Sequence, residues 1–472
     1  MKIHLSAVCG TAMASLAGLL KEKGHLVSGS DQDVYPPMST QLEAIGVRLL
    51  SPFRAENVPE DADLVVIGNA LSRGNPEVEV VLDRKQRMTS LPALLAEEFI
   101  RGRTSLVVAG THGKTTTTSL LAYLLNAAGL DPSFLVGGVP ADFDRSYRLG
   151  AGPHFVVEGD EYDCAFFDKR PKFVHYLPDL AIIGNLEFDH ADIYPDLPAV
   201  QTAFVRLLNV IPRRGMVLAG IESPALGEIL PQAKSRVETF GVGVEADWSA
   251  EQVVPAPEGW SFRLRRRGQD LGRFRSSLHG EHNVRNAVAA LAAAAAVGVE
   301  PEALREALSA FRGVKRRLEL RGQARGVAVF DDFAHHPTAV RETLSALRRG
   351  LEGAGAGRLV AVFEPRSYTS RTRIFQADFA RAFRGADQVI VAAAHLPGKV
   401  PAEQRLSEAE LVEGIRAGGG SARFIPGVEE IVDTLGAELV AGDRVVILSN
   451  GGFGGIHDRL LAALAAAVPT PG

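Results

Sequence analysis

A short glycine-rich segment in the first quarter of the chain carries the residue types best suited to phosphate chemistry. Leu106 to Ala109 has the pattern of a buried strand, a glycine turn follows, and a lysine with several threonines begins a helix. Such a turn directs backbone N–H groups at an anion, the lysine adds positive charge, and a hydroxyl can contact a phosphate-bound Mg²⁺. The segment therefore predicts an ATP site. The residues expected to contact the nucleotide are Gly110, Thr111, His112, Gly113, Lys114, Thr115 and Thr116.

The spacing of this segment departs from the GxxxxGK[ST] pattern, because Val108 occupies the position of the first glycine. A glycine turn with a solvated lysine is the simpler interpretation, but it does not explain the succession of threonines at Thr115–Thr118. Thr115 is the expected metal contact, and the later threonines can serve as helix caps.

Acidic residues and a histidine follow two other predicted strands. Glu158 comes directly after Phe155–Val157, and His190 lies in the polar loop after Leu180–Ile183. Open parallel sheets gather ligands at the carboxyl ends of their strands, so both side chains should face one cleft with Lys114, and we expect these three to be catalytic. The expected metal ligands are Thr115, Glu158 and His190. Mg²⁺ is the expected ion and the histidine leaves Mn²⁺ open, whereas surface charge on two loops is the alternative.

Composition limits the class of protein. A chain of 472 residues suggests about three domains of roughly 150 residues each. A net charge of −5 gives no reason to expect nucleic acid as a partner. Only Cys9 and Cys164 are present, which excludes a disulfide framework and predicts a cytoplasmic protein. The apolar start of the chain is interrupted by polar residues and reads as strand, turn and helix, and no run of about 18 apolar residues predicts a membrane span.

Short β-branched runs alternate with helical stretches along the chain, which predicts parallel sheets with crossover helices. The region from Val244 to Ser277 differs, because its alternating pattern indicates antiparallel strands. Expected boundaries divide the chain into 1–102, 103–313 and 314–472, with an exposed turn at 353–357 and a frayed tail at 468–472. The predicted strands are Leu64–Ile67, Leu106–Ala109, Phe155–Val157, Leu180–Ile183, Val327–Phe330, Leu359–Phe363, Val389–Ala392 and Val445–Leu448.

The first unit has its own candidate site. A turn follows the opening strand, and Asp31 lies about 20 residues on, where ribose-binding acids occur. The GxGxxG signature is absent, so a diphosphate such as a nucleotide sugar is as compatible as a dinucleotide, and an ordinary strand-to-helix turn is the simpler alternative. A second polar loop, Gly68–Pro76, could close over the same ligand. The candidate residues are Cys9, Gly10, Thr11, Asp31, Asn69 and Ser72.

The order and spacing of several motifs resemble the Mur ligases across essentially the whole chain. The segments that carry this resemblance are Gly110–Thr115, Glu158, His190, Gly280–Asn286, Arg316-Arg317 and Asp331–Pro337. It implies an α/β fold in three domains: a Rossmann-like N-terminal domain, a P-loop ATPase-like central domain and a Rossmann-like C-terminal domain. It also implies that ATP converts a carboxylate to an acyl phosphate, which an amine then captures. By resemblance the nucleotide is also contacted by Asn283, Asn286, Arg317, Asp332 and His336, with His335 an alternative to the last.

Within the family, four further segments are similar to the branch that joins UDP-N-acetylmuramate to the murein tripeptide L-Ala-γ-D-Glu-meso-diaminopimelate in peptidoglycan recycling. These segments are 33–40, 69–76, 166–170 and 449–457. The branch that adds L-alanine during peptidoglycan synthesis is the alternative. A tripeptide with several carboxylates needs cationic and amide partners, so we expect Arg366, Arg371 and Asn450 to help hold it, although solvated loop residues are an equal alternative.

Two points remain open. Several Mur ligases use a carbamylated lysine about fifteen residues beyond the histidine, yet no lysine occurs between Lys172 and Lys234. Other classes are a dehydrogenase, a simple ATPase or kinase, and a non-catalytic UDP-sugar binding protein; none of them explains both the first unit and the metal cluster. The sequence does not determine the oligomeric state.

Overall fold

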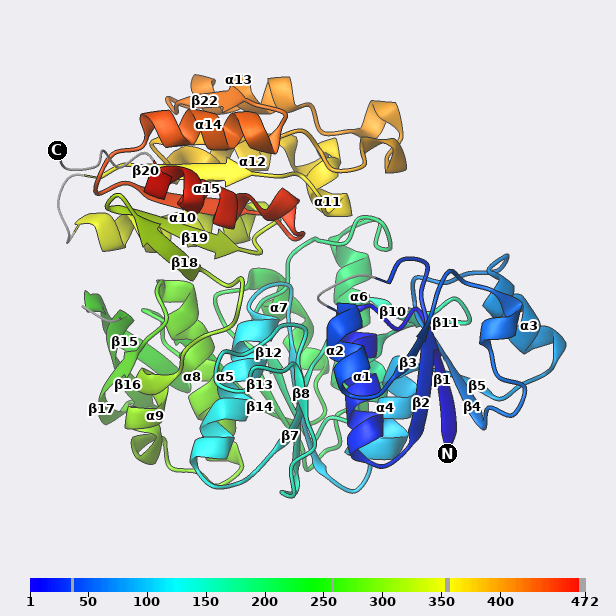
Figure 1. The fold of residues 1–472 in the computed structure, drawn as a ribbon. Coiled ribbons are helices and arrows are strands. Elements are labelled where there is room, and N and C mark those ends of the chain that lie inside the picture. The colour runs from blue at the N-terminus through cyan, green and yellow to red at the C-terminus, as the bar shows by residue number, and fades with distance from the viewer. Residues whose placement is uncertain (35–37, 257–258, 353–356, 467–472) are drawn as a thin grey trace.

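The computed structural model describes residues 1–34, 38–256, 259–352 and 357–466. Their strands form three main sheets and one small hairpin, and Figure 1 shows the three sheets as separate lobes. The predicted tail at 468–472, residues 353–356 of the predicted turn and residues 35–37 lie outside the described residues. The α/β architecture expected from the sequence is confirmed.

The first sheet has the strand order β3-β2-β1-β4-β5, and all its pairs are parallel. The opening strand, turn, helix and second strand are present as expected. Its strands are β1 (Lys2–Ser6), β2 (Leu26–Ser30), β3 (Arg48–Leu50), β4 (Leu64–Ile67) and β5 (Met88–Ser90). Its helices are α1 (Thr11–Glu22), α2 (Met38–Ala44), α3 (Pro76–Asp83) and α4 (Leu91–Leu95).

The central sheet has the order β17-β16-β15-β14-β13-β12-β6-β9-β7-β8. Its middle is parallel, whereas β15, β16 and β17 pair antiparallel, which confirms the expectation for Val244–Ser277. Its strands are β6 (Thr104–Ala109), β7 (Ser133–Leu135), β8 (Tyr147–Arg148), β9 (His154–Glu158), β12 (Leu180–Ile183), β13 (Met216–Gly220), β14 (Arg236–Val242), β15 (Trp248–Ala256), β16 (Gly259–Arg266) and β17 (Gln269–Ser276). Its helices are α5 (Lys114–Ala127), α6 (Leu197–Val210), α7 (Pro224–Ile229), α8 (Glu281–Ala296) and α9 (Arg305–Ala310), and the small hairpin is β10 (Asp163–Ala165) with β11 (Asp168–Pro171).

The third sheet has the order β18-β19-β23-β20-β21-β22, parallel except for its first pair. All eight strands predicted from the sequence are present across the three sheets, with ends that differ by no more than two residues. The strands are β18 (Glu319–Ala324), β19 (Val327–Asp332), β20 (Leu359–Phe363), β21 (Gln388–Val391), β22 (Ala422–Phe424) and β23 (Arg444–Leu448). The helices are α10 (Pro337–Glu352), α11 (Tyr368–Arg371), α12 (Gln376–Ala382), α13 (Glu408–Ala417), α14 (Val428–Glu438) and α15 (Ile456–Ala466).

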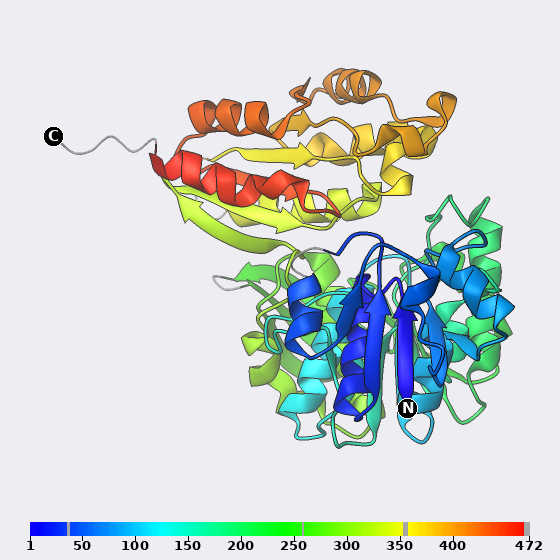
Figure 2. The same cartoon turned by 45° about the vertical axis from the view of Figure 1, so that its right-hand side comes forward.

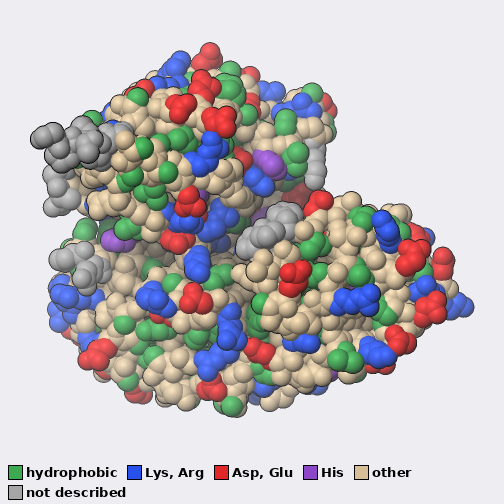
Figure 3. Space-filling model, in the orientation of Figure 1, with side chains coloured by type: hydrophobic (Ala, Val, Ile, Leu, Met, Phe, Trp, Pro, Cys, Tyr) green, Lys and Arg blue, Asp and Glu red, His purple; other side chains and the backbone are tan. Residues whose placement is uncertain are grey.

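The three sheets are joined in two different ways. The first and central sheets share one continuous cluster of buried apolar side chains, in which Leu16 of α1 and Phe155 of β9 both take part. The third sheet packs its helices into clusters of its own. Figure 2 shows this lobe above the other two, and in Figure 3 a groove marks their boundary on the surface. Among the described residues, the third sheet therefore shares no buried apolar cluster with the other two sheets.

Two expectations about the class of protein bear on the described residues. Cys9 and Cys164 are both free thiols, as expected from the lack of a disulfide framework. None of the described helices combines the length and the apolar character needed to cross a lipid bilayer.

Candidate active site

The phosphate loop lies at the carboxyl edge of the central sheet, between β6 and α5. Gly110 has φ of +128° and Gly113 has φ of +79°, backbone conformations that favour glycine at both positions. The backbone N–H of His112 donates to Asn185 Oδ1 at 2.8 Å, which attaches the loop to the end of β12. A Cβ at Gly113 would lie 2.7 Å from Asn286 Oδ1, so α8 packs directly over the turn.

Lys114 is buried against a carboxylate. Its Nζ donates to Gly110 O at 2.7 Å and lies 2.9 Å from Glu161 Oε2. Burial lowers the pKa of Lys114, but the negative charges of Glu161 and Asp160 outweigh it and leave the pKa raised. The loop thus holds a permanent cation at the place where phosphates should bind. Sequence reasoning did not single out Glu161, because several acidic residues follow β9.

Thr115 and Glu158 form the first candidate metal subsite. Thr115 Oγ1 donates to Glu158 Oε1 at 3.0 Å, and the second carboxylate oxygen accepts from Gly137 N at 2.7 Å. Arg317, from the segment before β18, donates to the same threonine hydroxyl at 3.1 Å. A hydroxyl and a carboxylate are oxygen ligands of the kind that Mg²⁺ prefers, so this pair fits the predicted ion.

His190 supplies the second candidate subsite. It has φ of +55°, and its Nε2 lies 3.0 Å from Glu161 Oε1. Burial lowers the pKa of His190, but the contact with Glu161 outweighs it and raises the pKa. Asp160, Glu161 and His190 can each direct one ligand atom to a common point. Lys114, Glu158 and His190 therefore meet in one cavity, as the positions at the strand ends predicted.

The other residues predicted to contact the nucleotide line the same cavity, which has a volume of about 530 Å³. Gly110 is the exception, and its carbonyl oxygen accepts from Lys114 Nζ. Asn286 Nδ2 donates to Asn283 Oδ1 at 3.0 Å on the first turns of α8. Arg317 lies over the Phe333 ring, 4.8 Å from its centroid, and burial lowers the pKa of this arginine. The nucleotide-binding roles of these residues stay predictions.

Asp332 lies at the end of β19 and is buried. Its carboxylate accepts from Leu318 N at 2.6 Å and from Ala334 N at 2.8 Å. Burial raises the pKa of Asp332, although Arg317 and these two backbone groups oppose the rise. The carboxylate therefore shapes the loop that carries His335 and His336 into the cavity.

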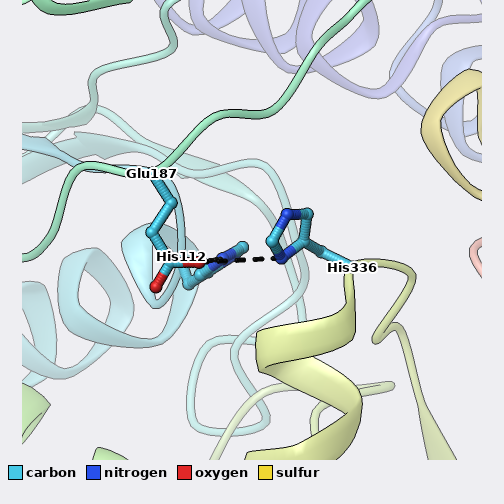
Figure 4. A group of neighbouring side chains, drawn as sticks. All are labelled: His112, Glu187 and His336. Carbon is cyan, nitrogen blue, oxygen red and sulfur yellow. Dashed lines mark hydrogen bonds and ion pairs between the residues drawn. The ribbon is translucent and has the colours of Figure 1, made fainter. Parts of the chain in front are cut away.

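Polar contacts join the loop after β12 to the third lobe. Thr369 Oγ1 donates to Asp189 Oδ1 at 2.8 Å, and Thr338 Oγ1 donates to Glu187 Oε2 at 2.7 Å. Figure 4 shows the Glu187 carboxylate beside His112, with His336 facing both from the third lobe. Burial raises the pKa of Glu187, but His112 outweighs it and lowers the pKa to about 2. Burial, together with His112, lowers the pKa of His336 to about 4. Sequence reasoning gave no role to Glu187, although it lies in the same polar loop as His190, or to Thr338, which directly follows the segment Asp331–Pro337.

The candidate site of the first sheet is a second cavity, of about 520 Å³. Asp31 Oδ2 accepts from Cys9 N at 2.9 Å, so the acid closes the turn after β1. Ser72 is exposed and is not among the residues that line the cavity, and its role stays a prediction. The residues predicted from the sequence that do line it are Cys9, Gly10, Thr11, Asp31 and Asn69.

Lys172 connects the two cavities. Its side chain lines the second cavity, and its Nζ donates to Asp160 Oδ2 at 2.7 Å, while Asp160 lines the first cavity. The lysine holds the pKa of Asp160 well below its usual range, although burial alone would raise it. Nothing in the local sequence pattern distinguished Lys172, which is the first residue of a short helical turn, Lys172–His175.

The third-lobe residues predicted to hold a peptide differ in position. Asn450 lines the first cavity, and its Oδ1 is buried without a hydrogen-bond partner among the described residues. Arg366 and Arg371 are not among the residues that line it. Arg371 Nη1 instead donates to the carbonyls of His395 and Leu396 at 3.1 and 3.0 Å. The structure thus places one of the three residues at the cavity, and the peptide-binding roles of all three stay predictions.

A phosphate loop at a parallel sheet edge, a buried lysine and clustered oxygen ligands define a nucleotide-dependent enzyme of three α/β lobes. Three family models match the chain: "Mur ligase family, catalytic domain" over residues 2–102, "Mur ligase middle domain" over 108–294, and "Mur ligase, glutamate ligase domain" over 316–451. The chain belongs to the Mur ligase family.

Individual relatives agree along nearly the full length. The chain is 44% identical over 98% of both chains to the UDP-N-acetylmuramate–L-alanyl-γ-D-glutamyl-meso-2,6-diaminoheptandioate ligase of Escherichia coli K12. It is 36% identical over 98% of its length, and 95% of the relative's, to a UDP-N-acetylmuramate–L-alanine ligase of Solibacter usitatus. A solved murein peptide ligase of Psychrobacter arcticus 273-4 matches with a TM-score of 0.74 and 39% identity, and the match covers 100% of both chains.

Proposed function

We propose that this protein joins the tripeptide L-Ala-γ-D-Glu-meso-diaminopimelate to UDP-N-acetylmuramate at the expense of ATP, in peptidoglycan recycling. The observation that carries the proposal is the likeness of 44% over nearly the whole chain to a ligase named for these substrates. The site supports it, because a phosphate loop, candidate metal ligands and a second cavity lie within one molecule. A requirement for ATP also places the proposed reaction in the cytoplasm.

The chemistry follows from the poor reactivity of a carboxylate. Transfer of the γ-phosphoryl group of ATP to the muramyl carboxylate makes an acyl phosphate. The amine of the acceptor attacks the acyl carbon, and phosphate leaves. Charge builds up on the transferred group, so catalysis needs cations held in place more than covalent help from the protein. Lys114 is the residue we assign to this task.

Two Mg²⁺ subsites complete the proposed assignment. Thr115 and Glu158 would hold the first ion, and His190 with a neighbouring carboxylate would hold the second. When bound, the ions neutralise phosphate charge during transfer. His190 and Lys114 share Glu161, so this carboxylate orients both the lysine and the histidine. The sequence has no lysine between Lys172 and Lys234 that could serve as a carbamylated ligand, and Lys172 pairs with Asp160.

The substrates divide between the two cavities. UDP-N-acetylmuramate would occupy the cavity of the first sheet, where the turn after β1 offers backbone N–H groups, and ATP would occupy the cavity at the phosphate loop. Lys172 lies between them and could guide the muramyl carboxylate toward the transferred phosphoryl group. We place the corresponding domains at 1–102, 103–313 and 314–472.

Addition of L-alanine is the second candidate function, because a relative at 36% identity bears that name. Phosphate release and product mass should be measured with ATP, Mg²⁺ and UDP-N-acetylmuramate, in the presence of tripeptide, L-alanine or no amine. We expect phosphate release and a condensed product with tripeptide only. A preference for L-alanine would establish the second candidate, and equal release without any amine would reduce the protein to an ATPase.

A further inference from the structure

Two histidines and a glutamate meet where the central and third lobes touch. His112 comes from the phosphate loop, Glu187 from the loop after β12, and His336 from the turn before α10 (Figure 4). Glu187 Oε2 lies 3.4 Å from His112 Nε2 and 3.8 Å from His336 Nδ1. One ligand atom from each side chain falls within 4.8 Å of the other two. This cluster is separate from Thr115, Glu158 and His190.

The spacing of these atoms suits a metal better than direct hydrogen bonds. An N–H···O hydrogen bond has its optimal length at about 2.9 Å, whereas ligand atoms around a tetrahedral Zn²⁺ with bonds near 2.1 Å lie about 3.4 Å apart. The two separations from Glu187 exceed the first distance and are close to the second. The Thr338 backbone N–H, which lies 3.3 Å from His336 Nδ1, is the long contact that a metal would replace.

The surroundings orient the three side chains as ligands. His336 Nε2 faces the Phe188 carbonyl oxygen at 3.2 Å, so a proton on Nε2 leaves Nδ1, which lies 3.8 Å from Glu187 Oε2, as the unprotonated nitrogen. Thr338 Oγ1 donates to Glu187 Oε2 at 2.7 Å and fixes that carboxylate. Metal-binding histidines and carboxylates are commonly held by such outer hydrogen bonds. The His112 and His336 rings, with centroids 4.6 Å apart, stay close enough to share one ion.

We propose that His112, Glu187 and His336 form a binding site for a divalent transition-metal ion of the Zn²⁺, Co²⁺ and Ni²⁺ group. Two imidazoles and one carboxylate make a set that such ions accept and that Mg²⁺, which prefers oxygen ligands, does not favour. Three protein ligands leave the fourth position open toward the cavity that both histidines line. Since the ligands come from two lobes, a bound ion links the third lobe to the phosphate loop.

The test is a titration of the full-length protein with Co²⁺ in excess Mg²⁺ and without nucleotide, followed by the visible d–d absorption of four-coordinate Co²⁺. The wild type should show these bands at one equivalent, and Zn²⁺ should abolish them and raise the melting temperature. His112→Gln and His336→Gln should each remove the bands and the Zn²⁺-dependent rise. Thr338→Val, which keeps all three ligands, should weaken Co²⁺ binding about tenfold.

The control separates this site from the proposed Mg²⁺ subsites. His190→Gln removes the histidine of the other cluster and should leave the Co²⁺ spectrum unchanged. Bands that survive in both His112→Gln and His336→Gln, or that disappear only in His190→Gln, would overturn the inference. Far-UV circular dichroism of each variant checks that the fold is retained, and absence of the bands from the folded wild type would also contradict the site.

Discussion

At the scale of single residues, Lys114 is the side chain on which the proposed chemistry depends most. Its Nζ is fixed by Gly110 O and Glu161, and its raised pKa keeps it charged at neutral pH. Lys114→Met should lower kcat for amide formation by at least about 100-fold, because the charge on the transferred phosphoryl group loses its buried cation. Steady-state assays of the condensed product measure this loss, and nearly unchanged turnover would contradict the role.

This variant also leaves Glu161 without its lysine partner, so that of the two side chains only His190 remains in contact with it. Removing one member of a buried ion pair commonly costs about 3–5 kcal/mol of folding free energy, so lost activity alone would be ambiguous. The matched control is Lys114→Met with Glu161→Gln, which removes both charges. It should recover stability against urea and remain inactive. Recovery of activity together with stability would show that Lys114 is only structural.

Of the three third-lobe residues predicted to hold the acceptor peptide, Asn450 is the one that lines the first cavity. Its buried Oδ1 lacks a hydrogen-bond partner in the described part of the chain. Asn450→Ala should raise the KM for tripeptide about tenfold, the cost of one lost hydrogen bond of about 1.4 kcal/mol, with little change in the KM for ATP. Arg373→Ala is a suitable control, because that arginine pairs with Glu410 on the surface. A larger effect on ATP than on tripeptide would exclude the assignment.

Residue types and spacing predicted the phosphate loop and the meeting of Lys114, Glu158 and His190, because each follows a strand end of one parallel sheet. They could not predict Glu161 as the partner of Lys114. Glu158, Asp160 and Glu161 lie within four residues, and only the path of the chain after β9 decides which carboxylate turns to the lysine. Glu187 was missed because its partners His112, His336 and Thr338 come from distant segments, two of them in the third lobe.

At the scale of elements, the ends of β12 and β13 approach so closely that only glycine fits. A Cβ at Gly220 would collide with the carbonyl oxygen of Gly184, the residue that begins the loop leading to His190. Gly220→Ala should therefore lower the free energy of unfolding by about 1–3 kcal/mol and displace that loop. Urea denaturation measures the stability, and the KM for ATP should rise as well.

The matched control for this substitution is Gly227→Ala in α7. A Cβ there has no heavy atom within 4 Å, and the residue has helical surroundings. This exchange should leave stability unchanged or raise it by about 0.4–1 kcal/mol, because alanine restricts the unfolded chain. Equal losses from both substitutions would mean that the contact between Gly220 and Gly184 is not the cause.

Buried strands were predicted well, because continuous apolar runs between turn residues leave few alternatives. The ends of the helices were predicted less accurately than the strands. The alanine-rich run that indicates a helix begins only at Ala287, but α8 begins at Glu281, directly after Gly280 with φ of +97°. The apolar pattern does not mark this first turn, since it carries polar residues that face the cavity. The order of the strands in each sheet could not be predicted from the sequence either, because it depends on the crossover connections rather than on the local sequence pattern.

At the scale of the whole molecule, buried histidines make stability depend on pH. Burial lowers the pKa of His282, His335 and His336, the last to about 4. Below pH 6.5 the unfolded chain therefore binds protons that the folded protein does not, and the free energy of unfolding should fall as pH decreases from 6.5 to about 4. His190, whose pKa is raised, opposes this trend as a single group, whereas His25, His154, His175 and His279 also have a lowered pKa and add to it.

Urea denaturation between pH 7 and pH 5 checks this prediction. The free energy of unfolding should decrease over that range, and the decrease should be smaller in His336→Gln, which removes one of the groups with a lowered pKa. A protein that is as stable at pH 5 as at pH 7 would contradict the burial argument.

The length of the chain and the alternation of strands and helices predicted three α/β units. They could not predict how these units join. The first and central sheets share one apolar cluster, whereas the third lobe meets them through contacts such as Thr338 with Glu187 and Arg285 with Glu342. Local sequence cannot show this difference, because it depends on which surfaces meet. Polar junctions of this kind favour relative motion, so the third lobe is the part expected to move during turnover.

The pairing of Lys114 with Glu161 also bears on how products depart. If the protein offered the Lys114 ammonium no anion after the reaction, the lysine would hold ADP strongly, because no other ionic contact would replace the one that is lost. Here the ammonium has an anion of its own within the protein, and re-forming that contact offsets part of the free energy lost when ADP dissociates. Such an enzyme can bind the reacting phosphoryl group tightly and still release ADP.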